Sequence, residues 1–433
     1  MPSVAILTTR CRKALVAALL GCLSGCLTEQ VPVDLLIEDV TVYAGTEGAP
    51  FVASIAIRDG KFLAIGNLDE SLYLPQERID GTGRFIIPGL WDAHTHIRSS
   101  EERGLDIEEF ARSGVTSIRD LGGYPERLKL VEHEITNGAA LGPNIYPSYF
   151  MLNGESFAGF QHVVASEEEV KAKIDVLASS GATQVKLHRA LSPEMLPAVV
   201  RLAHQRGLKA IGHIPLGVHP LDACQSGMDG IEHIGSFVES LVSVAADGER
   251  SSQIAIDYML SAAADPIYEC LAERGIAVTP TLVIYPTIAR RRAAGQNIPP
   301  EFVEFIESMK QLTYRLHEAG VILLAGTDTS DSNDPVDIEP GKSIVDELVL
   351  LEDAGIPMLD IIAIGSLNAA RSMGVADRSG SIEHGKDADF VLLSADPGES
   401  AQNIRSVVLV SQMGRVVFAD VQAAISANVV IDR

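Results

Sequence analysis

The chain has 433 residues, of which 46% are hydrophobic and 21% are charged, so it is typical of a globular protein with a large core and not of a disordered one. Its formal net charge is −24 at pH 7. Such an excess of acidic residues argues against binding to nucleic acid and against adhesion to anionic lipids through surface charge.

The N-terminal residues have the pattern of an export signal. A basic group around Arg10 precedes a short apolar run over 14–22, and Leu-Ser-Gly-Cys follows at 23–26. The run is too short to span a bilayer, which indicates a cleaved signal peptide over 1–25. The tetrapeptide resembles a bacterial lipobox, which implies lipidation of Cys26; an ordinary signal peptide is the alternative. Because Leu27 follows the cysteine, the resemblance implies an outer-membrane lipoprotein of the bacterial cell envelope that faces the periplasm.

Both ends of the mature chain are expected to be rich in strands. In the N-terminal segment 26–84, residues 32 to about 84 alternate in the manner of strands, with an Asp-Gly turn at 59–60 between two such runs. A second block with this pattern falls within 376–433. We therefore expect a small β-sandwich that both chain ends build together, beside a larger unit over 85–375.

The central region alternates between strands and helices. The pattern predicts helices that end before glycines or turns; their ranges are 166–180, 193–206, 251–274 and 300–319. A strand is expected over 275–281, without an obvious metal ligand.

Several short apolar runs in this region end in residues that bind metals. The run over 88–96 ends in His94-Thr95-His96, and side chains two residues apart share one face of a strand. Four further runs end at or near Lys186, His213, His233 and Asp328. The five runs together indicate a metal site more specifically than any one of these motifs does alone.

The spacing of these residues matches a (β/α)8 TIM barrel, in which each strand-helix unit takes about 30 residues. About three units separate His96 from Lys186, and about one unit separates each of the next two ligands. Asp328 follows after two units with an insertion. The candidate ligands would then lie on strands 1, 4, 5, 6 and 8 and converge at one mouth of an α/β barrel.

Taken together, these motifs resemble the amidohydrolase superfamily, in its two-metal branch with a carboxylated lysine. The resemblance extends from about residue 33 to about 420. Ser-Ile-Arg-Asp-Leu-Gly-Gly at 117–123 is similar to the second strand of Xaa-Pro dipeptidase-like and imidazolonepropionase-like members. Residues 380–391 resemble the return from the barrel to the side domain.

The resemblance implies a dinuclear site. His94, His96 and Asp328 would hold one divalent cation, His213 and His233 the other, and Lys186 would bridge both as a carbamate formed with CO2. A hydroxide would also bridge the two metals. Imidazole and carboxylate ligands favour zinc, with manganese, cobalt and nickel left open. Asp328 would take the proton of the hydroxide and deliver it to the leaving nitrogen.

Other polar residues have two interpretations. Asp120 either orients a ligand or caps a turn, and His188 either lies beside the metals or begins a loop. Among the histidines that match no ligand position are His162, His204, His219 and His317. The acidic run over 328–337 departs from a calcium-loop pattern, so a solvated loop is preferred. Cys224 and Cys270 are expected to be buried apolar residues, and a disulfide framework is not expected.

The predicted function is hydrolysis of an amide-type C–N bond in a peptide-like or N-acyl amino-acid substrate. Cyclic amides, lactones and phosphotriesters are alternative substrates for the same site, and a non-catalytic surface-binding lipoprotein is an alternative of another class. A mononuclear deaminase would need a glutamate soon after His213, where the sequence has none. The expected partner is a small molecule, membrane contact is through the lipid anchor only, and the oligomeric state stays open.

Overall fold

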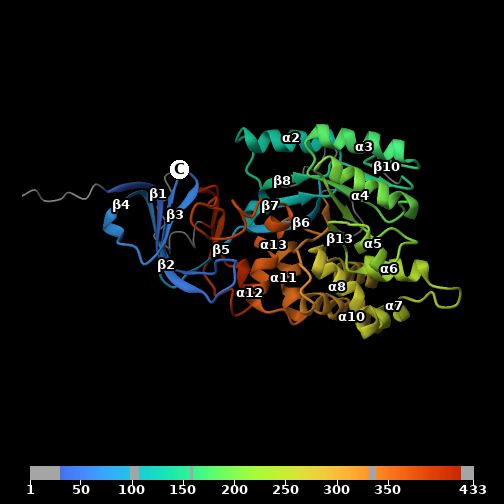
Figure 1. The fold of residues 1–433 in the computed structure, drawn as a ribbon. Coiled ribbons are helices and arrows are strands. Elements are labelled where there is room, and N and C mark those ends of the chain that lie inside the picture. The colour runs from blue at the N-terminus through green and yellow to red at the C-terminus, as the bar shows by residue number, and fades with distance from the viewer. Residues whose placement is uncertain (1–29, 98–106, 157–158, 331–337, 421–433) are drawn as a thin grey trace, which may run out of the picture.

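The computed structural model describes residues 30–97, 107–156, 159–330 and 338–420. A sheet region at one end adjoins a larger body of alternating strands and helices (Figure 1). The predicted signal segment 1–25 and Cys26 lie outside the described residues. Among the residues that are described, no helix combines the length and the apolar character needed to cross a bilayer.

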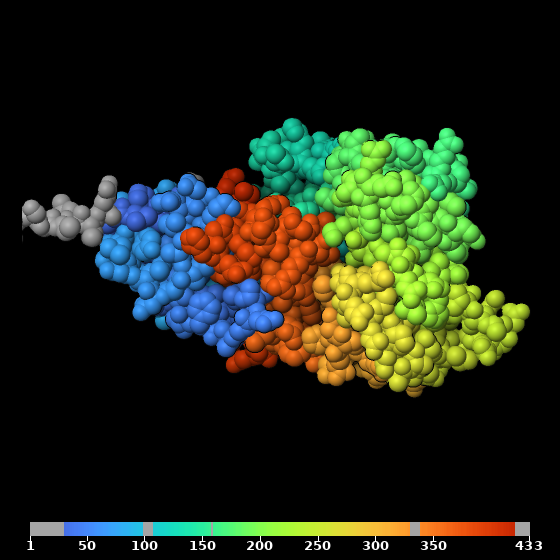
Figure 2. Space-filling model, viewed as in Figure 1, coloured from blue at the N-terminus to red at the C-terminus, as the bar shows by residue number. Residues whose placement is uncertain are grey.

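The sheet region joins the two ends of the chain, as the sequence predicts. Figure 2 shows residues from the last third of the chain packed directly against the N-terminal ones. Eight strands form one sheet in the order β18-β17-β16-β5-β1-β2-β3, with β4 paired to β1. Their bounds are β1 Val31–Val42, β2 Phe51–Arg58, β3 Lys61–Gly66, β4 Tyr73–Asp80, β5 Phe85–Pro88, β16 Phe390–Leu393, β17 Val407–Gln412 and β18 Arg415–Ala419.

Strand β5 is where the two ends meet, because it pairs in parallel with β1 and antiparallel with β16. The sheet has a hydrophobic cluster of its own that includes Ile37, Ile55 and Phe390, each of them fully buried. The Asp-Gly turn at 59–60 joins β2 to β3, as expected from the sequence. Because all eight strands belong to one sheet, the predicted arrangement of two facing sheets is not confirmed.

The larger body contains two parallel sheets. Six strands have the order β10-β9-β11-β12-β13-β14, and four have the order β15-β6-β7-β8. Strand β11 is buried along its whole length, as is usual for parallel strands covered on both faces. The bounds are β6 Leu90–His96, β7 Val115–Asp120, β8 Asn144–Pro147, β9 Met151–Asn153, β10 Gln161–Val163, β11 Gln184–Leu187, β12 Lys209–Gly212, β13 Gly230–Glu232, β14 Ala277–Thr279 and β15 Thr329–Ser330.

Backbone hydrogen bonds also connect the two parallel sheets. On one side, Thr183 N–H donates to the carbonyl of Pro147 over 2.9 Å. On the other side, Val278 N–H donates to Ile322 over 2.8 Å, and Ala93 N–H donates to Ala325 over 2.8 Å. The segment around 322–325 therefore lies between β14 and β6. Among the described residues, the strands of this body pair into two parallel sheets and do not form a closed barrel.

Helices cover the outside of the parallel sheets (Figure 1). The α-helices are α1 Ile107–Arg112, α2 Pro125–Thr136, α3 Glu167–Ser180, α4 Leu196–Gln205, α5 Pro220–Gln225, α6 Gly235–Val244, α7 Ser252–Leu260, α8 Asp265–Arg274, α9 Ile284–Ala293, α10 Pro300–Glu318, α11 Ser343–Asp353, α12 Met358–Ile364 and α13 Leu367–Ser372. The short 3-10 helices are η1 Glu70–Leu72, η2 Pro193–Met195, η3 Ala262–Ala264 and η4 Ala401–Arg405.

Helix α3 follows its sequence signals closely. The side chain of Ser166 accepts a hydrogen bond from Glu169 N–H at the first turn, and Gly181 ends the helix in the left-handed conformation at φ 87°.

The single helix predicted over 251–274 is wrong, because the structure has α7, η3 and α8 there. Ser261 is extended between α7 and η3. Pro266 stands in the first turn of α8, where a proline is tolerated, whereas inside a longer helix it would remove a hydrogen bond.

The prediction for the two central cysteines is also wrong. Cys224 of α5 and Cys270 of α8 form a disulfide with their Cα atoms 6.3 Å apart. The two residues are separated by 46 positions in the chain, so only the packing of α5 against α8 brings them together. Cysteine spacing alone does not contain that information.

Candidate metal centre

Two adjoining segments hold three of the predicted ligands. Strand β6 is fully buried and carries His94 and His96 at alternate positions on one face. Asp328 immediately precedes β15, which pairs in parallel with β6. Asp328 N–H donates to the carbonyl of His94 over 2.8 Å, so the backbone itself brings the carboxylate to the histidines.

The side chains of these residues converge. Oδ1 of Asp328 lies 3.2 Å from Nε2 of His94 and 3.1 Å from Nε2 of His96. His233, directly after β13, joins them with its ring centroid 4.5 Å from that of His94. One ligand atom from each of His94, His233 and Asp328 lies within 4.8 Å of the others, which is the spacing of a site that could hold a metal ion.

His213, Lys186 and His188 lie on the other side of His233. The ring of His213, directly after β12, is 4.7 Å from the ring of His233 and 4.7 Å from that of His188. Lys186 lies in the middle of β11, is 1% exposed, and pairs in register with Ile211. These contacts therefore join His94, His96, His213, His233 and Asp328 into one cluster, and Lys186 is buried on the strand next to β12, which leads to His213.

Electrostatics in the cluster favour the neutral form of His213 and His233 and the ionised form of Asp328. Burial, together with the charge of His94, lowers the pKa of His233 to about 3. Burial lowers the pKa of His213 well below its usual value. Burial alone would raise the pKa of Asp328. The charge of His94 and hydrogen bonds with the neighbouring histidines outweigh burial, so the net effect is a pKa below the usual value. These are the protonation states in which such side chains bind a metal.

A buried ion pair orients His94, and the sequence analysis did not identify it. Nδ1 of His94 lies 2.8 Å from Oε2 of Glu232, so the Nδ1 proton points to this carboxylate and Nε2 faces Asp328. Arg119 on β7 donates to Oε1 of Glu232 over 2.5 Å and to the carbonyl of Ala93 over 2.6 Å. Burial opposes ionisation of Glu232, but Arg119 and His94 outweigh it and lower its pKa.

Two further contacts position His233 and the segment that carries Asp328. Nδ1 of His233 lies 2.8 Å from Oγ1 of Thr281, on the turn after β14. The buried carboxylate of Asp92 accepts hydrogen bonds from Thr327 N–H over 3.0 Å and from the Thr327 hydroxyl over 2.6 Å. Asp92 thereby ties β6 to the segment that presents Asp328.

The backbone at the centre is constrained. His233, Thr281 and Asp328 have positive φ angles of 63°, 51° and 60°. Residues other than glycine rarely adopt this conformation, and for the β-branched Thr281 it is especially unfavourable. Gly326 passes so close to β6 that a Cβ atom there would lie 2.9 Å from the backbone nitrogen of His94.

The structure shows a turn-capping role for Asp120. Its carboxylate accepts from Ile97 N–H over 2.7 Å and from Gly122 N–H over 3.2 Å, which is a turn-capping role. The effect on the ligands is indirect, because the carbonyl of Gly122 lies 2.9 Å from Nδ1 of His96. The ring of His188 contacts that of His213, which favours a position beside the candidate ligands.

The histidines named above as matching no ligand position lie elsewhere. His162 stacks on Phe150, His204 contacts Asp229, His219 caps α5 and His317 contacts Asp360. Within the acidic run, Asp328 belongs to the cluster, and 331–337 lie outside the described residues.

The donor set fits a divalent metal by its chemistry. It offers neutral imidazole nitrogens and one carboxylate, buried at the end of parallel strands, with hydrogen-bonded partners that hold the histidine rings in place. This combination suits zinc and other first-row divalent ions better than calcium, which prefers oxygen ligands.

The chain is similar to several known proteins. Ochratoxinase of Aspergillus niger is 21% identical over 430 residues, which span 83% of this chain and 82% of the relative. The crystal structure of A. niger ochratoxinase aligns with a TM-score of 0.69 over 91% of this chain and 97% of that one. A Xaa-Pro dipeptidase crystallised with bound methionine in the active site aligns with a TM-score of 0.67 at 20% identity, over 89% and 100% of the two chains.

An uncharacterized protein of Mycobacterium bovis is 24% identical over 365 residues, spanning 77% of this chain and 85% of the relative. The structural likenesses are at low identity and show a common fold. The family model that matches is decisive for membership, because it covers residues 85–419 and so includes every candidate ligand. The chain belongs to the Amidohydrolase family.

Proposed function

We propose that this protein is a metal-dependent amidohydrolase that cleaves an amide-type C–N bond in a peptide-like or N-acyl amino-acid substrate. The observation that supports the proposal most directly is the convergence of His94, His233 and Asp328 within 4.8 Å, inside the span matched by the family. Fold alone does not define an activity, so the proposal depends on this site.

In this proposal the centre holds two divalent cations, with zinc favoured. His94, His96 and Asp328 would bind one, and His213 and His233 the other. Lys186, carboxylated by CO2, would bridge them, and its side chain is 1% exposed. When bound, the two cations would lower the pKa of a water molecule between them and polarise the carbonyl group of the substrate.

Asp328 is suited to move the proton. Its lowered pKa keeps the carboxylate ionised at neutral pH, so it can accept a proton from the attacking water. An amine is a poor leaving group unless it is protonated, and Asp328 would return the proton to the departing nitrogen. The side chain is 26% exposed, which leaves it accessible to a substrate.

Two of the similar proteins have names that agree with this chemistry. One is an ochratoxinase and another a Xaa-Pro dipeptidase, and both align with most of this chain. We also propose that the two parallel sheets form a (β/α)8 barrel, which the hydrogen bonds at both of their borders support.

We further propose that the mature protein is anchored to the outer membrane by lipid on Cys26 and faces the periplasm. The disulfide between Cys224 and Cys270 supports an oxidising compartment, since such bonds persist there.

The test combines metal analysis with a substrate panel. Purified mature protein should contain about two divalent ions per chain, and Lys186→Met should lose most of this content together with its activity. His317→Asn, which changes a histidine outside the cluster, should retain both. The panel contains dipeptides, N-acyl amino acids, hydantoin-like rings, lactones and phosphotriesters. Faster turnover of lactones or phosphotriesters than of every amide would refute the C–N assignment, and no turnover of any compound would favour the non-catalytic alternative.

A further inference from the structure

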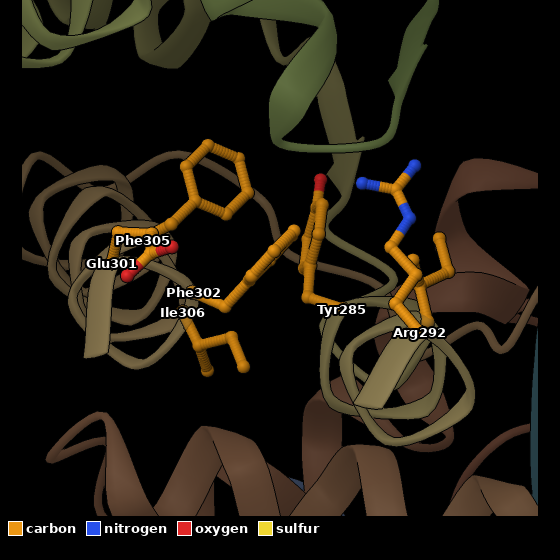
Figure 3. A pocket seen from close by; sticks show the side chains of 7 residues that line it. Tyr285, Arg292, Glu301, Phe302, Phe305 and Ile306 are labelled. Atoms are coloured by element: carbon orange, nitrogen blue, oxygen red, sulfur yellow. The ribbon is translucent and has the colours of Figure 1, made fainter. Parts of the chain in front are cut away.

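A cavity of about 380 Å³ lies between helices α9 and α10. Its walls are largely aromatic and branched apolar side chains, among them Tyr285, Phe302, Phe305 and Ile306 (Figure 3). Pockets for small organic ligands have volumes of this order and are lined in the same way.

Tyr285 connects the wall of the cavity to the segment that carries the candidate ligand His233. This residue lies in the first turn of α9, just after the turn that contains Thr281, whose hydroxyl contacts His233. The hydroxyl of Tyr285 accepts a hydrogen bond from Gly235 N–H over 2.9 Å, two residues beyond His233. One wall of the cavity is therefore attached to the backbone that presents a candidate ligand.

The polar groups of the cavity lie at two ends. The guanidinium of Arg292 stands over the ring of Phe302, 5.5 Å from its centroid, and no carboxylate pairs with it among the described residues. Glu301 lies on the opposite side, beyond the aromatic rings (Figure 3). The positive charge of Arg292 favours a carboxylate group of a ligand at that end of the cavity, and the negative charge of Glu301 disfavours one at the other end.

The aromatic side chains present both ring faces and ring edges to the cavity. The rings of Tyr285 and Phe305 meet edge to face, with centroids 5.6 Å apart. Phe302 and Phe305 are half-buried, so their rings have apolar surface that a ligand could cover. An aromatic ligand gains from such contacts beyond the area that it buries.

We propose that this cavity is the specificity pocket of the enzyme and binds the aromatic side chain of a substrate that has a free carboxylate, with Arg292 as the partner of that carboxylate. The substrate class is then an N-acyl amino acid or short peptide with an aromatic residue beside the cleaved bond. This inference rests on the proposed function, whose metal centre would cut the amide bond held next to Tyr285.

The first experiment measures binding without turnover. Isothermal titration of the metal-loaded mature protein uses 3-phenylpropionate, 3-phenyl-1-propanol and propionate, which contain no amide bond. The phenyl ring should tighten binding about tenfold to a hundredfold over propionate, as expected for burying one aromatic side chain. Phe302→Ala should remove this gain, and Arg292→Gln should remove the preference for the carboxylate over the alcohol.

Val303→Ala is the matched control, because Val303 lies on the same helix and is 46% exposed to solvent. It should bind all three compounds like the unchanged protein. Equal binding of 3-phenylpropionate and propionate, or equal losses in Phe302→Ala and Val303→Ala, would overturn the inference.

The second experiment compares kcat/KM for N-acetyl-phenylalanine and N-acetyl-glycine. The aromatic compound should be the better substrate, and Phe302→Ala should reduce this preference at least about tenfold. Amide hydrolysis without any preference would refute the specificity pocket and leave the proposed function in place. Ring-dependent binding of 3-phenylpropionate without hydrolysis of any amide would refute the proposed function instead.

Discussion

The ion pair behind His94 provides the sharpest test of how the centre is organised. Glu232 is 0% exposed and Arg119 is 1% exposed, and the carboxylate binds both Arg119 and Nδ1 of His94. Glu232→Gln keeps the shape of the side chain and removes its charge. If the new amide group faces His94, it donates to Nδ1 and places the ring proton on Nε2, which then cannot bind a metal.

The size of the effect follows from the burial of both partners. Removing the charge of one member of a buried pair leaves the other uncompensated, so the free energy of unfolding of the metal-free protein should fall by about 3 kcal/mol. Losing the partner that orients a metal-binding histidine should weaken metal affinity about tenfold to a hundredfold. Competition with a chelator measures the affinity, and urea denaturation measures the stability.

Two further variants separate orientation from stability. Glu318→Gln makes the same change on an exposed residue and should alter neither measurement. Arg119→Met combined with Glu232→Leu replaces the pair by apolar side chains, which should recover much of the stability while metal affinity stays low. A Glu232→Gln protein whose metal affinity stays within about twofold of the original would refute the role given to this carboxylate.

Three other predictions test separate parts of the structure. Burial raises the pKa of Glu347 from 4.5 to about 8, so the native state keeps a proton that the unfolded chain releases. The free energy of unfolding, measured by urea denaturation, should therefore fall as the pH rises from about 5 to 8, and Glu347→Gln should flatten this decline. Identical pH profiles of the variant and the original protein would contradict this role of Glu347. Thiol labelling of the denatured protein without reductant should leave Cys224 and Cys270 unmodified, and full labelling would contradict the disulfide. Gly326→Ala should lower metal content, since its methyl group would press on the backbone of His94; unchanged content would mean that the segment can move aside.

Local sequence signals, which depend on only a few neighbouring residues, predicted helix ends and strand faces well. Ser166 and Gly181 mark the ends of α3 by their capping chemistry, and the alternation of His94 and His96 along a strand is a local property. These features depend on the chain near each residue, where the sequence is most informative.

Contacts between distant segments were not predictable in this way. Glu232 stands directly before His233 in an apolar run, and its importance appears only when Arg119 on another strand approaches it. The disulfide required knowledge of how α5 packs against α8. Thr281 lies within an expected strand without a recognised ligand, and its contact with His233 depends on a left-handed turn that the sequence does not signal.

The left-handed residues of the centre suggest how the fold tolerates this strain. His233, Thr281 and Asp328 each follow the end of a buried strand or strand-like segment, where the neighbouring backbone is already held by hydrogen bonds. His233 N–H donates to the carbonyl of Thr279 over 2.8 Å, and Asp328 N–H to that of His94 over 2.8 Å. An unfavourable conformation persists only where the surrounding structure imposes it. The cost at these positions is therefore offset by packing and hydrogen bonding of the parallel strands, which hold the candidate ligands together.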